Sequence, residues 1–224
     1  MKYNSKLTHS IGWGAILTIV LTLSPIASQA ETSGVDNKVK ITSDIPYLDV
    51  QHNGKTVRIE RNQDTAHKLT NSFSKTSRVC PPFCINPIEL SPGIKTIGEL
   101  ELLKFLENEV KNNEGLLIDA RMPAWFEKGT IPGSVNIPFT VLSKGLDSKH
   151  TVKILKLLGA TEKKGNWDFA NVRKLMLFCN GSWCGQSPKA LRNLSKLGYP
   201  EDKLFWYRSG MQSWQQLGLT TVTP

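Results

Sequence analysis

The residues best suited to chemistry lie in one loop, Cys179-Asn180-Gly181-Ser182-Trp183-Cys184-Gly185-Gln186. Its first residue, Cys179, directly follows an apolar run, residues 175–178, whose length and composition are typical of a buried strand. Open α/β sheets bind their ligands at the carboxyl ends of strands, so Cys179 stands where a reactive sulfur is expected. From the residues alone, two interpretations of Cys179 are about equally favoured. It is either catalytic, or it is structural, for example as half of a Cys179–Cys184 disulfide.

This loop can stabilise a thiolate if it curls around Cys179. Successive backbone N–H groups would then point inward and form an anion-binding concavity, and Gly181 and Gly185 permit the backbone angles of such a curl. An amphipathic helix follows, for which Ser187 is the expected N-cap and Pro188 the first residue. The partial positive charge at the start of that helix also favours a thiolate, so the pattern predicts a lowered pKa for Cys179.

Several stretches, in order along the chain, resemble the signatures of the rhodanese-like (sulfurtransferase) family. They are residues 116–121 (LLIDAR), residues 129–138 (GTIPGSVNIP), Phe178-Cys179 with the glycine-bearing loop and helix that follow, and residues 204–214. The resemblance covers roughly residues 92–221. It implies an α/β domain with a parallel five-stranded sheet flanked by helices.

The resemblance also implies a sulfurtransferase in which Cys179 carries a persulfide. The remaining loop residues would bind substrate: Asn180, Gly181, Ser182, Trp183, Cys184, Gly185 and Gln186. Asp119 and Arg121 would orient loops near the site through hydrogen bonds and an ion pair. Arg208 follows the last expected strand and should approach the loop, where its planar donor fork could hold an oxyanion such as the sulfonate end of thiosulfate.

The chain departs from the usual family pattern at the site. The cysteine loop is longer than in the commonest members, Cys184 falls where many carry an arginine, and Thr130 replaces the usual histidine. A second cysteine motivates an alternative function, a thiol–disulfide redox or persulfide-sensing module with Cys179 attacking and Cys184 resolving. A catalytically silent binding domain that uses the loop for recognition is the third hypothesis. Because no arginine closes the loop, a cysteine phosphatase is set aside.

A second cysteine pair, Cys80 and Cys84, is separated by Pro-Pro-Phe and cannot lie on a regular helix. The pair could close a local disulfide or act as a redox pair that serves the active loop. Zinc would need two further ligands, and no second Cys/His pair has zinc spacing, so we expect a structural or redox-linked role and no metal or cofactor.

The N-terminal part of the chain divides in two. Residues 1–30 resemble a secretory signal peptide, with Lys2 and Lys6 before an apolar stretch too short to span a bilayer comfortably. The mature protein is therefore expected in the periplasm, without a stable membrane anchor after cleavage. Residues 31–91 form an N-terminal extension with the cysteine linker, and residues 92–224 the rhodanese-like domain.

Local patterns predict two further elements. Asn53-Gly54 between two alternating runs indicates a β-hairpin, with strands at 47–51 and 56–61 and His52 as a solvated loop residue. A capping box at Thr96 predicts a helix from there to about residue 110.

Composition narrows the classes of partner. The chain has 224 residues, four cysteines and a formal net charge of +9. These cysteines are too few for a disulfide scaffold. No basic stripe is interleaved with aromatic residues, so no nucleic-acid partner is expected. The expected partners are a small-molecule sulfane-sulfur donor and a thiol acceptor, either a small molecule or a protein.

Overall fold

The computed structural model describes residues 39–224. The signal peptide expected at residues 1–30 lies outside the described residues. Five short strands form a parallel sheet in the order β3-β9-β8-β4-β5. Their bounds are β3 Lys95–Ile97, β4 Gly115–Asp119, β5 Ser134–Asn136, β8 Lys174–Phe178 and β9 Leu204–Tyr207. This arrangement confirms the expected parallel five-stranded sheet.

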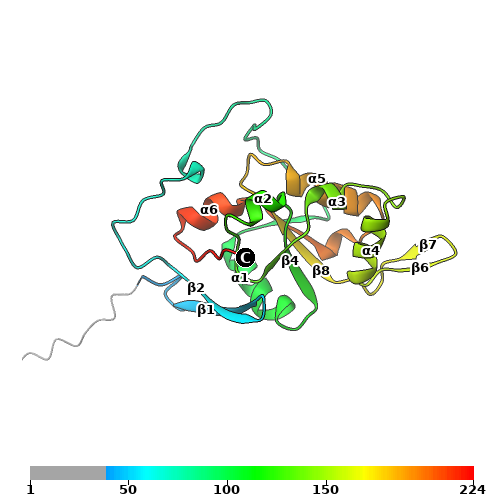
Figure 1. Ribbon diagram of the computed structural model, residues 1–224, viewed down its shortest axis with the longest axis horizontal. Coiled ribbons are helices and arrows are strands. Elements are labelled where there is room, and N and C mark those ends of the chain that lie inside the picture. The colour runs from blue at the N-terminus through cyan, green and yellow to red at the C-terminus, as the bar shows by residue number, and fades with distance from the viewer. Residues whose placement is uncertain (1–38) are drawn as a thin grey trace, which may run out of the picture. The chain divides into compact units, whose positions relative to one another are not determined.

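Successive side chains of the strands pack alternately into two separate cores, one on each face of the sheet, as expected for strands buried on both faces. On one face Leu175, Leu177 and Trp206 pack under α3 (Phe139–Leu142), α4 (Lys149–Leu157) and α5 (Gln186–Lys196). On the other face Met176 and Phe178 pack under α1 (Glu99–Phe105), the π-helical turn η2 (Leu106–Val110) and α6 (Gly210–Gln216). Figure 1 shows α3, α4 and α5 grouped on one side and α6 on the other.

The predicted hairpin is present. Strands β1 (Tyr47–His52) and β2 (Lys55–Glu60) pair antiparallel, with Tyr47 opposite Glu60 and His52 opposite Lys55. Asn53 and Gly54 both have positive φ, 48° and 74°, which is the turn geometry that Asn-Gly favours. Ile59 is fully buried and joins the core under α1 and α6, so the hairpin completes that face of the sheet.

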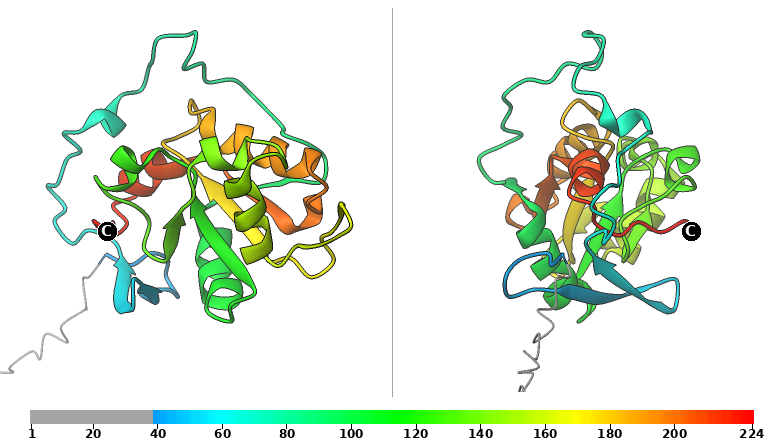
Figure 2. Two further views of the ribbon diagram at one scale, coloured as in Figure 1. Left: turned by 45° about the vertical axis from the view of Figure 1, so that its right-hand side comes forward. Right: turned by 90° about the vertical axis from the view of Figure 1, so that its left-hand side faces the viewer.

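The C-terminal residues tie the hairpin to the sheet domain. Thr220 N–H donates to the Glu60 carbonyl at 3.1 Å, and Thr130 pairs with Val222 in an isolated bridge. Both views of Figure 2 place the C-terminal end next to the hairpin. The remaining short elements are η1 Ser72–Ser74, α2 Pro123–Phe126, β6 Thr161–Lys163, β7 Asn166–Asp168 and η3 Glu201–Lys203.

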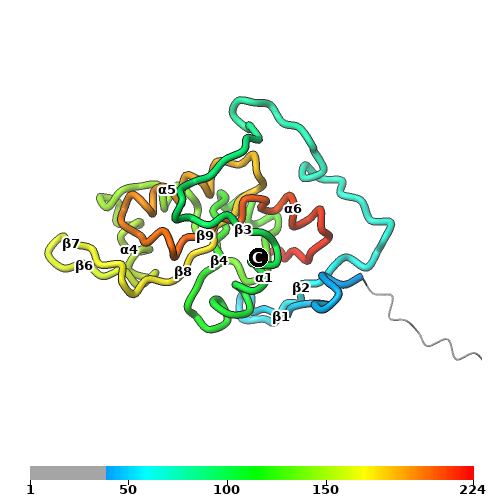
Figure 3. The backbone as a smooth tube through the Cα atoms, turned by 180° about the vertical axis from the view of Figure 1, so that it is seen from behind, coloured from blue at the N-terminus to red at the C-terminus, as the bar shows by residue number. Residues whose placement is uncertain are grey.

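The connection from β2 to β3, residues 61–94, arches outside the sheet, as Figures 1 and 3 both show. It contains η1, whose Phe73 is buried in the core under α6. Within residues 39–224, no helix has the length and apolarity needed to cross a membrane.

Two local expectations are wrong. Thr96 does not cap a helix: it lies in the edge strand β3, and the helix begins after Gly98, whose N–H donates to Glu101 at 3.1 Å. His52 is not solvated. It is 7% exposed, its Nδ1 accepts a hydrogen bond from Gly133 N–H at 3.2 Å, and burial lowers its pKa. In both cases the residue pairs with a residue that is distant in sequence.

Candidate functional site

Cys179 is the first residue after β8, a fully covered strand near the middle of the sheet. The carbonyl of the preceding residue, Phe178, accepts a hydrogen bond at 3.0 Å from the N–H of Ala120, which directly follows the neighbouring strand β4. Only 2% of Cys179 is exposed. The sheet thus delivers the thiol to its carboxyl edge and holds the backbone there.

The start of α6 fixes the first residues of the loop. Met211 N–H donates to the Cys179 carbonyl at 3.0 Å, and Gln212 N–H donates to the Asn180 carbonyl at 2.9 Å. Gly210 has a φ of +56°, and a Cβ there would press on the Cys179 carbonyl oxygen. Position 210 therefore requires glycine for two reasons, the left-handed backbone and the close approach of the loop.

Hydrogen-bond donors surround the sulfur of Cys179. Ser187 Oγ donates to Sγ at 3.2 Å, and the N–H groups of Gly181 and Ser187 also act on it. Trp206 Nε1 donates to Ser187 Oγ at 3.1 Å, so the Ser187 proton is left for the sulfur. When protonated, Cys179 itself donates to the Cys184 carbonyl at 3.4 Å.

This environment favours the thiolate. Burial is the largest influence and raises the pKa of Cys179, but hydrogen bonds from the Cys184 thiol, the Ser187 hydroxyl and the backbone together outweigh it. The result lowers the pKa of Cys179 to about 7. A large thiolate fraction at neutral pH makes this sulfur a competent nucleophile.

Cys184 is the complementary partner. It is a free thiol, 6% exposed, and its pKa is raised because it donates its proton to Cys179, because it is buried, and because a thiolate lies beside it. Cys179 is likewise free. The loop therefore holds one thiol poised to ionise and one that stays protonated next to it.

A buried ion pair supports the loop from β4. Arg121 Nη2 lies 2.6 Å from Asp119 Oδ2, and Arg121 Nη1 donates to Asn180 Oδ1 at 3.2 Å. Thr130 Oγ1 donates to the same Asp119 oxygen at 2.8 Å. Asp119 and Arg121 are thus linked to the cysteine loop through Asn180, and Thr130, at the place of the usual histidine, bonds to Asp119.

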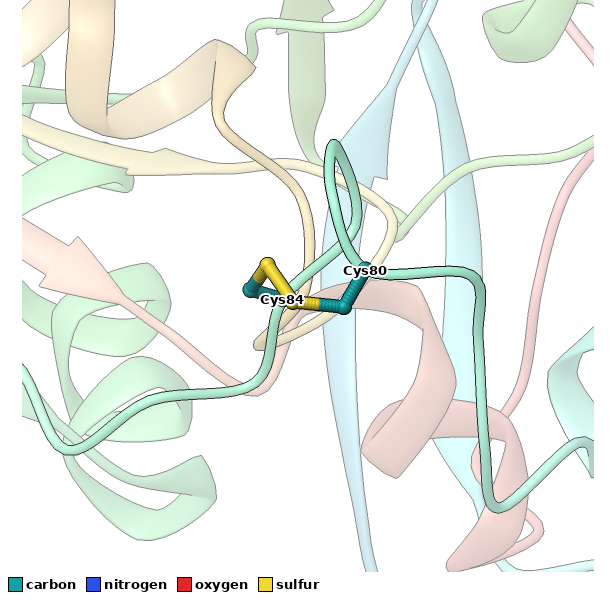
Figure 4. The surroundings of a disulfide bond; sticks show 2 residues. All are labelled: Cys80 and Cys84. Carbon is teal, nitrogen blue, oxygen red and sulfur yellow. A yellow bond between two sulfur atoms is a disulfide. The ribbon is translucent and has the colours of Figure 1, made fainter.

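Residues 73–86, which we call the strap, cover the middle of the loop. Within the strap Cys80 and Cys84 form a disulfide with their Cα atoms 4.6 Å apart, one of the two roles considered for this pair (Figure 4). The Arg78 guanidinium lies 3.9 Å from the centre of the Trp183 ring, and Phe83 meets the same ring edge-on at 5.6 Å.

Gln212 links α6, loop and strap. It accepts from Trp183 Nε1 at 2.8 Å and donates to the Lys75 carbonyl at 2.9 Å. The strap is therefore tied to the same helix that fixes the loop backbone.

A family model for the rhodanese-like domain matches residues 102–217, more than half of the chain. The chain belongs to the rhodanese-like family. No curated protein sequence matches it.

Solved structures of similar fold include three whose sequences are distant. The human single-domain sulfurtransferase is 22% identical over 54% of this chain and 95% of that one, with a TM-score of 0.38. A rhodanese-related protein from Thermoplasma volcanium is 22% identical over 58% of this chain and 99% of that one, with a TM-score of 0.38. A rhodanese with anions from E. coli is 19% identical over 49% and 99%, with a TM-score of 0.33.

The other predicted site residues of this rhodanese-like chain are Ser182, Gly185 and Gln186 in the loop and Arg208 after β9. Gly185 is the N-cap of α5 and Gln186 its first residue, while Ser182 is half-buried in the turn. Arg208 follows β9 as expected, but its Nη2 donates to the Asn86 carbonyl at the end of the strap. Among the described residues, Arg208 makes no hydrogen bond to the cysteine loop.

Two contributors to the site were missed. Ser187 is not the N-cap of α5, since its hydroxyl lies between Cys179 and Trp206. Its place at the end of the loop, just before a helix-starting proline, was the available signal. Arg78 lies outside the residues matched by the family, and only its position beside the Cys80–Cys84 pair hinted at it.

Proposed function

We propose that the protein is a sulfurtransferase that carries sulfane sulfur on Cys179. The observation that carries this proposal is the Cys179 sulfur itself, which is held at the carboxyl edge of the sheet among converging donors with a pKa of about 7. The same donors suit a bound persulfide, because its terminal sulfur is also anionic at neutral pH. Family membership adds that the domain which carries Cys179 is a rhodanese-like domain.

The reaction has two half-reactions. The Cys179 thiolate attacks the outer sulfur of thiosulfate, a bond forms between the two sulfurs, and the S–S bond of the donor breaks with its electron pair leaving on sulfite. An acceptor thiolate or cyanide then attacks the outer sulfur of the persulfide, and Cys179 leaves as thiolate. Because a covalent intermediate separates the two steps, ping-pong kinetics are expected.

Mass spectrometry tests this proposal directly. The reduced protein is incubated with thiosulfate, its intact mass is recorded, and fragmentation locates the change. We expect the gain of one sulfur atom on Cys179 and its removal by cyanide, with no gain in Cys179→Ser. Intersecting initial-rate plots together with no sulfur-loaded protein would contradict a sulfurtransferase.

A thiol–disulfide redox module is the second candidate, and the Cys184 thiol favours it. Cys184 is a free thiol hydrogen-bonded to Cys179, so it lies close enough to attack a mixed disulfide formed there. The Cys184→Ser variant separates the two functions. It should retain sulfur loading if the protein is a sulfurtransferase, and should lose turnover if Cys184 resolves a mixed disulfide at Cys179.

We further propose that the protein acts in the periplasm after removal of residues 1–30, on the strength of their signal-peptide pattern. The N-terminus of the protein recovered from cells tests this. A mature chain that begins near residue 31 is expected, and an unprocessed Met1 would contradict export by this route.

A further inference from the structure

The strap is anchored at both ends to the elements that build the site. Near its start Phe73 is buried in the core under α6, and the Lys75 carbonyl accepts from Gln212. At its end the Asn86 carbonyl accepts from Arg208, the residue that follows β9. The disulfide-closed turn between these anchors therefore stays over Trp183 and the cysteine loop.

Arg78 is the charged residue that the strap brings to this loop. Its guanidinium stacks on Trp183, and its Nη2 donates to the Ser72 carbonyl at 2.8 Å. The Trp183 ring in turn lies close to the loop backbone at Gly181: a Cβ added at Gly181 would be 2.9 Å from Trp183 Nε1. Gly181 is one of the residues whose N–H acts on the Cys179 sulfur. Contacts thus run without a break from Arg78 to the nucleophile.

No carboxylate among residues 39–224 pairs with the Arg78 guanidinium. The ion pairs among residues 39–224 join Arg58 to Asp49, Arg121 to Asp119, Lys156 to Glu162 and Lys174 to Glu109, and none includes Arg78. Burial lowers the pKa of Arg78, and no carboxylate opposes that effect. The Arg78 guanidinium is held by the Trp183 ring and the Ser72 carbonyl but by no anion, so its charge is available to an anionic ligand.

The Arg78 Nε–H also has no hydrogen-bond partner among the described residues. Within the described part of the chain, four buried side-chain polar atoms have no hydrogen-bond partner. Three of them are guanidinium Nε atoms, those of Arg61, Arg78 and Arg208, and the fourth is the acceptor Oε1 of Gln186. Unpaired buried N–H groups are rare in proteins and call for a partner that accepts hydrogen bonds.

We propose that Arg78 is a substrate-binding residue that selects sulfur donors with an anionic end, such as the sulfonate of a thiosulfonate. The substrate class rests on the proposed function, whereas the anion preference rests on the strap. Trp183 fixes the guanidinium plane, and the free Nε–H and the remaining Nη–H groups offer the fork that an oxyanion accepts. This assigns to the strap the part that the sequence assigned to Arg208.

Alkylation of Cys179 by two reagents of similar shape tests the anion preference without sulfur transfer. Iodoacetate is anionic and iodoacetamide is neutral, and each transfers its carbon to the thiolate with loss of iodide. In Arg78→Ala the ratio of the iodoacetate rate to the iodoacetamide rate should fall about tenfold, since one charge-assisted contact is worth about 1.4 kcal/mol or more. The iodoacetamide rate itself should stay unchanged.

Two variants serve as matched controls. Arg58→Ala removes another arginine stacked on an aromatic ring, 3.7 Å from the Tyr47 centroid in the hairpin, and should leave the ratio unchanged. Phe83→Ala removes the other strap contact with Trp183 but no charge, and should also leave it unchanged. An equal loss in Phe83→Ala, or a fall of both rates in Arg78→Ala, would show a packing role and overturn the assignment.

Steady-state kinetics with thiosulfate give a second readout. Arg78→Ala should raise the KM for thiosulfate about tenfold with a smaller change in kcat, and Arg78→Lys should lie between this variant and the wild type. If iodoacetate selectivity depends on Arg78 but no sulfur is ever loaded, the sulfurtransferase proposal fails and the anion site stands. If sulfur is loaded equally well without Arg78, the anion site fails and the sulfurtransferase stands.

Discussion

At the scale of single residues, the site depends on hydroxyl and thiol groups that tune one sulfur. Ser187 is the clearest case, because among the described residues its hydroxyl accepts from Trp206 and donates to the Cys179 sulfur alone. A serine that the sequence suggests as a helix cap is thus part of the reactive centre.

Ser187→Ala should raise the pKa of Cys179 from about 7 by about one to two pH units, since a hydrogen bond to a charged group is worth about 1.5–3 kcal/mol. Cys179 is an acid, so a higher pKa means less thiolate at pH 7 and slower alkylation there. At a pH well above both values the rates of variant and wild type should converge. The pH dependence of the iodoacetamide rate measures this.

Ser182→Ala is the matched control, since Ser182 lies in the same loop and its side chain makes no hydrogen bond among the described residues. Its alkylation midpoint should remain near the wild-type value. A midpoint that is unchanged in Ser187→Ala would mean that the backbone N–H groups alone set the acidity of Cys179.

The Asp119–Arg121 ion pair offers a test of buried charge. Both side chains are almost fully buried, at 0% and 1% exposure, so Asp119→Asn strands the arginine and should lower the free energy of unfolding by about 3–5 kcal/mol. Asp49→Asn breaks an ion pair whose side chains are 40–49% exposed and should change stability little. Denaturant titration of both variants measures the difference, and equal effects would contradict this account.

At the scale of elements, the cysteine loop after β8 is shaped by the start of α6, which follows β9. Gly210 at the start of α6 lies against the Cys179 carbonyl with a φ of +56°, whereas a methyl group at Gly145 would meet no atom within 4 Å. The loop backbone therefore has one contact that tolerates no side chain.

Gly210→Ala should lower the free energy of unfolding by about 1–3 kcal/mol, through the left-handed backbone and the overlap with the loop carbonyl. Cys179 reactivity should also fall, because the loop must shift to make room. Gly145→Ala should leave both the urea midpoint and the alkylation rate close to wild type. A fully reactive Gly210→Ala protein would show that the loop does not depend on this contact.

The elements also show what local patterns can and cannot predict. The hairpin, the buried strand before Cys179 and the helix after the loop follow from periodicity and turn residues, which act over a few positions. Ser187 and His52 were misjudged because Trp206 and Gly133, which are far away in sequence, supply their partners. Arg78 was overlooked for the same reason, since only folding brings the strap onto Trp183.

At the scale of the whole molecule, residues 47–74 of the N-terminal extension are part of the folded unit. Ile59 from the hairpin and Phe73 from the strap share a core with Leu117 and Met176 of the sheet. The hairpin therefore should not unfold independently of the domain that carries Cys179.

Ile59→Ala should lower the free energy of unfolding by about 2–5 kcal/mol, because the side chain is 0% exposed and its removal leaves a cavity. The loss should appear in the single main transition, as followed by tryptophan fluorescence. Val57→Ala, in the same strand but only partly buried, should cost less. A main transition that stays in place in Ile59→Ala would make the hairpin an independent appendage.

The contact between Glu60 and Thr220 spans 160 positions of the chain. A ribosome adds about 5–20 residues per second, so on the order of ten seconds pass between synthesis of the hairpin and synthesis of the tail that fastens it. A hairpin closes within microseconds. An isolated two-stranded hairpin is marginally stable at best, so in the newborn chain it opens and closes with Ile59 exposed until the core under α6 has been synthesised.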